Sequence, residues 1–293
     1  LSWGVSAWFV SPNLQLPEER KLLSTAGEGG CGKTSDWTHV DLPAIRFPDC
    51  GIADPFYMGD YRVPNTCSGG IRSYFSMPGR TSHLLLGVHV SSEIALSSRQ
   101  WLQALEKEWN VSSLSGNQFI FRHSLFASGS PLDKAIAGLG RADYDSLAPL
   151  ASHFEATRKA LGEDREWLLR AVIRFVQEIP YETITEDAMG LRPPLAVLHE
   201  FGGDCDSKSL LAAALLSYLG WSTAVISNSP RKHAVLGVGT SLLDGTRISG
   251  SDSSYVMTEM TAVRAPGDMT GSDLRPSSDP RAQGWTVRPV DSP

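Results

Sequence analysis

Residues 202–220, GGDCDSKSLLAAALLSYLG, constrain the fold more than any other segment of the chain. Two glycines precede a run rich in leucine and alanine, and Gly220 is typical of the residue just past a helix C-terminus. The apolar residues recur at helical spacing, which predicts an amphipathic helix with one buried face. That face comprises Leu211, Ala214, Leu215, Tyr218 and Leu219.

Cys205 lies at the start of this predicted helix. Unpaired backbone N–H groups and the helix dipole favour a negative charge there, so a thiol loses its proton readily and an oxyanion can be bound. Asp204 and Asp206 flank the sulfur and oppose a thiolate by like charge, so a nearby cation is required. The alternative is a buried core cysteine, the commonest fate of a free thiol.

His233 is the candidate base for this thiol. It begins an apolar segment, HAVLGVG at residues 233–239, after a turn at residues 228–232. A base at the start of a strand can reach a nucleophile at the tip of a facing helix, and its imidazolium would supply the required cation. The alternative is that His233 is a surface residue, as a lone histidine at a strand start ordinarily is.

Three segments together, GGDCDSKSLLAAALLSYLGW, KHAVLGVG and YVMTEMTA, resemble the core of the transglutaminase-like superfamily, and within it the bacterial cysteine peptidase branch. The resemblance extends upstream to FVQEIPY at residues 175–181 and covers residues 168–267. It implies an α+β, papain-like fold in which a helix bearing the cysteine packs on an antiparallel sheet.

The resemblance also implies an activity. We expect a cysteine peptidase that hydrolyses a peptide or isopeptide amide of a protein or peptide substrate, with no cofactor and no metal. Cross-linking by a protein-glutamine transglutaminase and a catalytically inactive interaction module are the alternatives.

A third catalytic member is expected on the strand after the histidine strand, where the family usually places an acid. Glu259 occupies that position, and a carboxylate there would fix the tautomer of His233 and stabilise its imidazolium. Glutamate is one methylene longer than the usual aspartate. Asp244 and Asp252, in the intervening loop, are therefore competing candidates.

An oxyanion donor is expected from an aromatic or glutamine side chain upstream of the cysteine. Gln177 and Tyr181 are the matching positions. The alternatives are that Gln177 is a solvated helix residue and that Tyr181 packs in the core.

Changes in composition and in apolar periodicity along the chain predict a mixed N-terminal domain at residues 1–142, the enzyme core at 143–268 and a polar, flexible tail at 269–293. Helices are expected at 93–109, 145–161 and 163–178. Strands are expected at 82–90, 116–127, 221–227, 234–239 and 255–260.

Composition excludes two classes of partner. The 293 residues carry a net charge of −6 and no basic stripe, which argues against nucleic acid. No apolar run reaches the roughly 18–20 residues that span a bilayer. Because the chain opens at Leu1 and not at methionine, we expect that an upstream segment has been removed, which leaves cytoplasmic and exported locations both open.

Two features of the first 70 residues remain ambiguous. Cys31, Cys50 and Cys67 contain no CxxC pair, so they fit either one disulfide or three free thiols better than a zinc site. Residues 27–34, GEGGCGKT, match a phosphate-binding loop. Their neighbours predict neither the strand nor the helix that such a loop needs, so a flexible glycine loop is the better interpretation.

Overall fold

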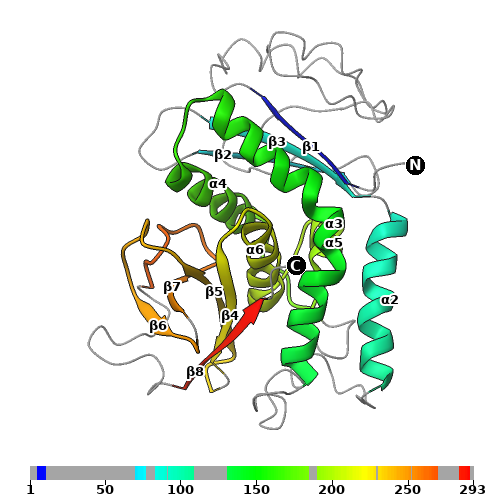
Figure 1. The fold of residues 1–293 in the computed structure, drawn as a ribbon. Helices are drawn as coiled ribbons and strands as arrows, with labels where there is room; N and C mark the ends of the chain where they lie inside the picture. Colours follow the sequence, from blue (N-terminus) through cyan, green and yellow to red (C-terminus); the bar gives the residue numbers. More distant parts are fainter. Residues whose placement is uncertain are drawn as a thin grey trace.

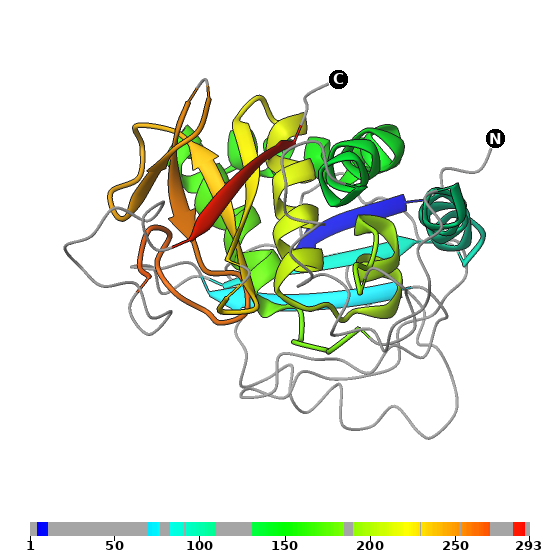
Figure 2. The ribbon, with the colours of Figure 1, turned by 90° about the horizontal axis from the view of Figure 1, so that it is seen from below.

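The computed structural model describes residues 5–10, 70–76, 83–90, 92–108, 131–184, 190–228, 230–251, 253–269 and 284–290. Over these ranges the chain is an α+β protein with two antiparallel sheets and helices packed between and beside them (Figure 1, Figure 2). The first sheet has the strand order β1-β3-β2, and its strands are β1 (Val5–Val10), β2 (Gly70–Ser76) and β3 (His83–Val90). The predicted strand at 82–90 is thus confirmed as β3, whereas 116–127 lies outside the described residues.

Helix α6 contacts β4 and β5 on one side and the helices α3, α4 and α5 on its other sides. The structure describes the following helices. They are α2 (Ser92–Glu108), α3 (Pro131–Ala160), α4 (Arg165–Glu178), α5 (Pro194–Glu200) and α6 (Cys205–Tyr218). The predictions for α2 and α4 are confirmed. The prediction at 145–161 found only the second half of α3, because glycines interrupt the first half. Gly138 is one of them, and a Cβ there would meet Trp101 Cη2 of α2 at 2.4 Å.

The central helix α6 is buried on all sides, so the prediction of a single buried face is wrong. Every residue from 205 to 217 is buried, including Asp206 and Lys208. A helix that is hydrophobic all round is typical of a protein core, and α6 is enclosed by helices as well as by the sheet. The polar residues of its first turns are therefore buried and need partners inside the protein.

The second sheet has the strand order β6-β7-β5-β4-β8. Its strands are β4 (Ser222–Asn228), β5 (His233–Gly239), β6 (Arg247–Ser249), β7 (Ser254–Thr258) and β8 (Trp285–Val290). Alternate residues of β5 face opposite sides. Leu236 belongs to the core around α6, and Val235 to a smaller cluster with Met257 and Trp285. The sheet therefore separates two apolar clusters of unequal size.

Strand β8 corrects the expectation of a flexible tail for part of residues 269–293. It pairs with β4 through the whole of Trp285–Val290, with Trp285 opposite Asn228. Trp285 and Val290 are buried, and their burial attaches this short edge strand to the sheet. At the other expected boundary, α3 runs through residue 142 without a break. The division into domains stays a prediction.

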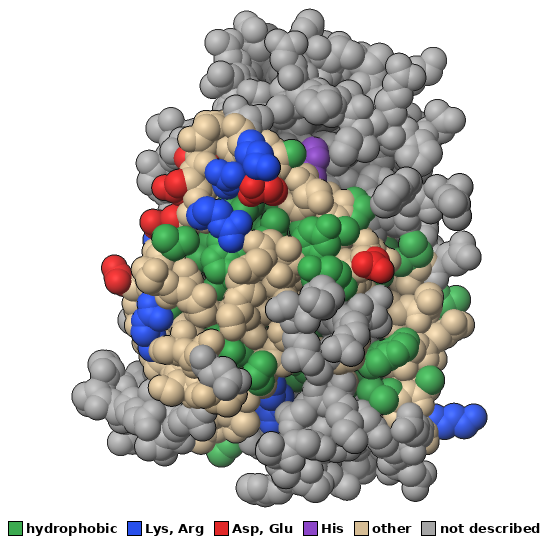
Figure 3. All heavy atoms as spheres, viewed as in Figure 1, with side chains coloured by type: hydrophobic (Ala, Val, Ile, Leu, Met, Phe, Trp, Pro, Cys, Tyr) green, Lys and Arg blue, Asp and Glu red, His purple; other side chains and the backbone are tan. Residues whose placement is uncertain are grey.

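The surface seen in Figure 3 carries charges of both signs. Lys and Arg side chains are interspersed with Asp and Glu side chains over the region where α3 ends and α4 begins. Ion pairs on these helices include Arg158–Glu155 at 2.8 Å and Arg170–Glu166 at 2.7 Å. Positive charge on this face is thus balanced locally by carboxylates. Within the described ranges, no helix combines the length and the apolar character needed to cross a bilayer.

Candidate active site

Cys205 is the first residue of α6, and Gly202 and Gly203 lead into it, with Gly203 paired to Tyr181. Asp204 is the N-cap, and its Oδ1 accepts a hydrogen bond from the backbone N–H of Ser207 at 3.2 Å. This cap satisfies one of the free N–H groups of the helix start and defines where the helix begins. The thiol is buried, with 7% of the residue exposed.

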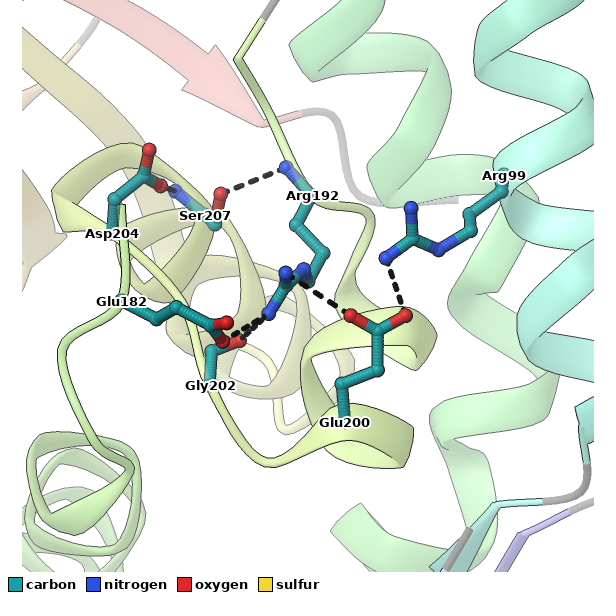
Figure 4. A network of polar contacts seen from close by, with 7 residues as sticks. All are labelled: Arg99, Glu182, Arg192, Glu200, Gly202, Asp204 and Ser207. Carbon is teal, nitrogen blue, oxygen red and sulfur yellow. Dashed lines mark hydrogen bonds and ion pairs between the residues drawn. The ribbon is translucent and has the colours of Figure 1, made fainter. Parts of the chain in front are cut away.

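A buried arginine holds the turn in front of Cys205 (Figure 4). Arg192 donates through Nη1 to the carbonyl of Gly202 and to Glu182 Oε2, both at 2.8 Å, and its Nη2 lies 3.1 Å from Glu200 Oε2. Its backbone N–H donates to Ser207 Oγ at 2.8 Å. A Cβ on Gly202 would lie 2.1 Å from Glu182 Oε2, so glycine leaves room for this carboxylate. The network therefore ties the turn to three neighbouring segments.

The surroundings of the Cys205 thiol oppose its ionisation. Burial raises its pKa most, and the charges of Asp206 and Asp204 raise it further. The backbone N–H groups of Ala234 and Asp206 donate to the sulfur and lower the pKa, but by less. Taken alone, the thiol therefore stays protonated at neutral pH.

The two carboxyl groups beside Cys205 interact with each other. Burial, the charge of Asp204 and a hydrogen bond between the two carboxyls all raise the pKa of Asp206. Asp206 therefore retains a proton at a pH at which an exposed aspartate would have lost it.

His233 begins β5 and pairs with an acid, as expected. Its Nε2 lies 2.7 Å from Glu259 Oε2, and its ring meets that of Trp285 edge-on with centroids 6.2 Å apart. The preceding turn is fixed by a hydrogen bond from Arg231 N–H to Asn228 Oδ1 at 3.1 Å, and Lys232 has a left-handed φ of 51°. A constrained turn thus leads directly into the histidine.

Glu259 follows the end of β7 and is held from both sides. Its Oε1 accepts from the backbone N–H groups of Met260 and Thr261 at 2.9 and 2.8 Å, and from Thr261 Oγ1 at 2.7 Å. Burial would raise its pKa, but His233 and Thr261 outweigh burial and lower it to about 2. Glu259 is therefore the carboxylate that contacts His233. Asp244 is exposed, and Asp252 lies outside the described residues.

Strand β5, which begins with His233, packs against α6, which begins with Cys205. The backbone N–H of Ala234, the residue after His233, lowers the pKa of the Cys205 thiol, in keeping with this packing of β5 on α6. Because Nε2 of His233 is occupied by Glu259, Nδ1 is the ring nitrogen left for the thiol proton. Helix, strand and loop therefore each contribute one of the three predicted catalytic side chains.

The two predicted oxyanion donors have different surroundings. Gln177 is buried, and its Nε2 donates to the carbonyls of Glu259 at 2.8 Å and Arg264 at 3.1 Å. Both amide hydrogens are thus in use, so Gln177 is neither solvated nor free to bind an oxyanion. Tyr181 is 56% exposed and does not pack in the core.

The position of Tyr181 keeps it a candidate donor. Its backbone pairs in parallel with Gly203, and the flanking hydrogen bonds join Gly203 to Pro180 and Glu182 at 3.2 and 3.1 Å. Burial raises the pKa of its hydroxyl, and the charges of Cys205 and Asp204 raise it further. A side-chain hydrogen bond with Thr183 lowers this pKa in part.

The sequence analysis missed two buried cations near the site, Arg192 and Lys208. Lys208 is completely buried on α6, and its Nζ donates to the carbonyls of Gln177 at 3.1 Å and Ile179 at 2.5 Å. Both carbonyls lie at the C-terminal end of α4, where a positive charge is favourable. A lysine in an otherwise apolar helix was the available signal.

Other sequence features remain outside the site. Residues 27–34, together with Cys31, Cys50 and Cys67, lie outside the described residues. Among the described residues, no three His, Cys, Asp or Glu side chains gather as a possible metal site. Comparisons with protein-family models, curated proteins and solved structures give no match to this chain.

Proposed function

We propose that this chain is a thiol-dependent acyl-transfer enzyme that hydrolyses peptide or isopeptide amides with Cys205, His233 and Glu259. The observation that carries the proposal is the contact of 2.7 Å between His233 Nε2 and Glu259 Oε2, at the start of the strand β5 that packs against the Cys205 helix α6. The Cys-bearing helix against an antiparallel sheet also supports a papain-like core of the transglutaminase-like type.

The first half of the reaction forms a thioester. His233 Nδ1 takes the proton of the Cys205 thiol, and the sulfur bonds to the substrate carbonyl carbon, whose oxygen becomes an oxyanion. When the oxyanion collapses, the carbon–nitrogen bond breaks. The leaving amine takes the proton from His233 Nδ1, and the acyl group stays on Cys205.

The second half returns the free enzyme. His233 Nδ1 takes a proton from water, the hydroxide oxygen bonds to the thioester carbon, and the carbon–sulfur bond breaks. The product is a carboxylic acid, and the thiolate recovers the proton held by His233. If a substrate amine replaces water, the same steps give a cross-link, so the ending depends on which acceptor reaches the thioester.

The imidazolium has to stabilise the thiolate, because burial and the carboxylates raise the pKa of Cys205. Glu259, with a pKa of about 2, is ionised throughout the neutral range and stabilises a proton on His233. Thiolate and imidazolium then form together as an ion pair. We further propose that Tyr181 Oη assists the backbone N–H groups at the start of α6 in binding the oxyanion.

The test is the rate of iodoacetamide alkylation of each cysteine against pH, read by peptide mass spectrometry. We expect the alkylation of Cys205 to show an apparent pKa well below the ordinary thiol value of about 8.5, and His233→Ala to abolish that shift. His199→Ala is the matched control, because His199 Nδ1 contacts the Val90 carbonyl at 2.9 Å, away from Cys205. If Cys205 titrates as an ordinary thiol or never reacts, the proposal of an enzyme fails, and the alternative of a catalytically inactive interaction module takes its place.

A second assay separates the two endings of the reaction. Mixed peptides and a fluorescent primary amine are incubated with the wild type and with Cys205→Ala. New carboxyl termini that depend on Cys205 support hydrolysis. Incorporation of the amine in their place would identify transglutaminase cross-linking.

A further inference from the structure

We propose that Gln177 is a positioning residue, which holds the loop of Glu259 in place and so keeps His233 aligned with Cys205. This inference rests on the proposed function. It replaces the role of oxyanion donor that the sequence suggested for Gln177. The residue lies near the C-terminal end of α4 and is buried.

The side-chain amide of Gln177 bridges both ends of one short loop. Its Nε2 donates to the carbonyl of Glu259 at 2.8 Å and to that of Arg264 at 3.1 Å. Between these points the chain turns back so that Thr261 can donate twice to Glu259 Oε1. The backbone that carries the carboxylate is therefore fixed to α4, while the carboxylate itself contacts His233.

The other side of Gln177 is attached to the helix of the nucleophile. Lys208 Nζ donates to the backbone carbonyl of Gln177 at 3.1 Å, and Lys208 lies three residues after Cys205 on α6. The contacts form a closed path, which runs from α6 to α4, to the 259–264 loop, to His233, and through the packing of β5 on α6 back to the helix of Cys205. Nucleophile and base sit on different elements, and Gln177 joins them at a distance from the reacting atoms.

The direction of the effect follows from this path. Without the two amide hydrogen bonds, the loop can shift and the Glu259 carboxylate stabilises the imidazolium less well. The thiolate–imidazolium pair is then less favoured, so the apparent pKa of Cys205 rises toward that of an ordinary thiol. Glu259→Gln should act in the same direction and more strongly.

The experiment measures alkylation of Cys205 against pH in the full chain carrying Gln177→Met, which keeps length and removes both donors. We expect the apparent pKa of Cys205 to rise by about half a unit or more, the scale of one lost hydrogen bond. Arg170→Gln is the control, because Arg170 is on the same helix but pairs only with Glu166 at the surface in the contacts we describe. It should leave the profile unchanged.

A double variant separates positioning from a general loss of structure. If Gln177 acts through Glu259, Gln177→Met should add almost nothing to the shift already produced by Glu259→Gln. Additive shifts, or an unchanged profile in Gln177→Met when His233→Ala has an effect, would overturn this inference and leave the proposed function standing. A Cys205 that is indifferent to His233→Ala would overturn both.

A second substitution covers the case in which Gln177→Met does not fold. Gln177→Glu keeps the shape of the side chain and can donate at most one hydrogen bond, and then only when protonated. The same rise in apparent pKa is expected, and it should disappear in the Glu259→Gln background. No rise would again contradict the positioning role.

Discussion

The two halves of the candidate site treat charge in opposite ways. At the start of α6, burial and two aspartates raise the pKa of Cys205, and Asp206 itself retains a proton. At the ends of β5 and β7, Glu259 has a pKa of about 2 and accepts hydrogen bonds on both oxygens. The surroundings of Cys205 therefore disfavour a negative charge, whereas those of Glu259 stabilise one.

This difference indicates where the thiol would be activated. A helix N-terminus alone does not ionise Cys205, because the cost of burial exceeds the contribution of the backbone N–H groups. In the proposed reaction, activation would come from the imidazolium, which Glu259 would stabilise. Neutralising Glu259 tests one half of this contrast, and neutralising Asp204 and Asp206 tests the other.

The largest effect is expected from Glu259→Gln. A glutamine amide would place an N–H where His233 Nε2 now faces Oε2, which favours the tautomer with its proton on Nδ1 and leaves no acceptor for the thiol proton. We expect kcat/KM on a peptide substrate to fall by roughly 10³- to 10⁴-fold.

Asp244→Asn is the matched control for Glu259→Gln, because Asp244 is exposed and was a competing candidate for the acid that orients His233. It should leave kcat/KM unchanged. Equal losses in the two variants would contradict the assignment of Glu259.

The next effect is a gain in stability from Asp206→Asn. Asp206 has a folded pKa above its unfolded value near 3.9, so the folded state binds more protons and loses stability as pH rises from about 4 toward the folded pKa. Asparagine has no such loss, and its amide can still donate to Asp204. At pH 7 we therefore expect Asp206→Asn to unfold at a higher temperature than the wild type.

Thermal unfolding of wild type and Asp206→Asn from pH 4 to pH 8 checks this prediction. The gain should be small near pH 4 and grow as pH rises. A gain that is independent of pH would mean that Asp206 is not the group that titrates.

Much of the fold could be predicted, because its strongest elements carry local signals. Periodicity located α2 and α4, and an apolar run flanked by polar residues located β3. Burial of α6 on every side could not be seen from one helix, because it depends on the neighbours that the fold brings to it. Strand β8 was missed for a related reason, since Trp285 and Val290 are buried only when β4 lies beside them.

The candidate site divides in the same way. Cys205 and His233 were proposed from their positions at the start of a predicted helix and a predicted strand, and Glu259 from the family resemblance; of these predictions, the pairing of His233 with Glu259 is confirmed. The roles of Gln177 and Lys208 depend on partners that lie 29 or more residues away in the sequence. The role of Arg192 depends on the backbone carbonyl of Gly202. Sequence spacing carries no record of such contacts, so these residues could be identified only from the structure.

The smallest effect is expected from Asp204→Asn, which tests the charge at the nucleophile directly. Asparagine is as good an N-cap as aspartate, so α6 should keep its start while one negative charge near the sulfur is weakened. Part of the charge can pass to Asp206, so we expect the apparent pKa of Cys205 to fall by only about half a unit in the alkylation profile. Neutralising both acids should lower it further, because burial then remains the main opposing term. If the double variant leaves the profile unchanged, the two aspartates do not oppose the thiolate, and the contrast between the halves of the site rests on burial alone.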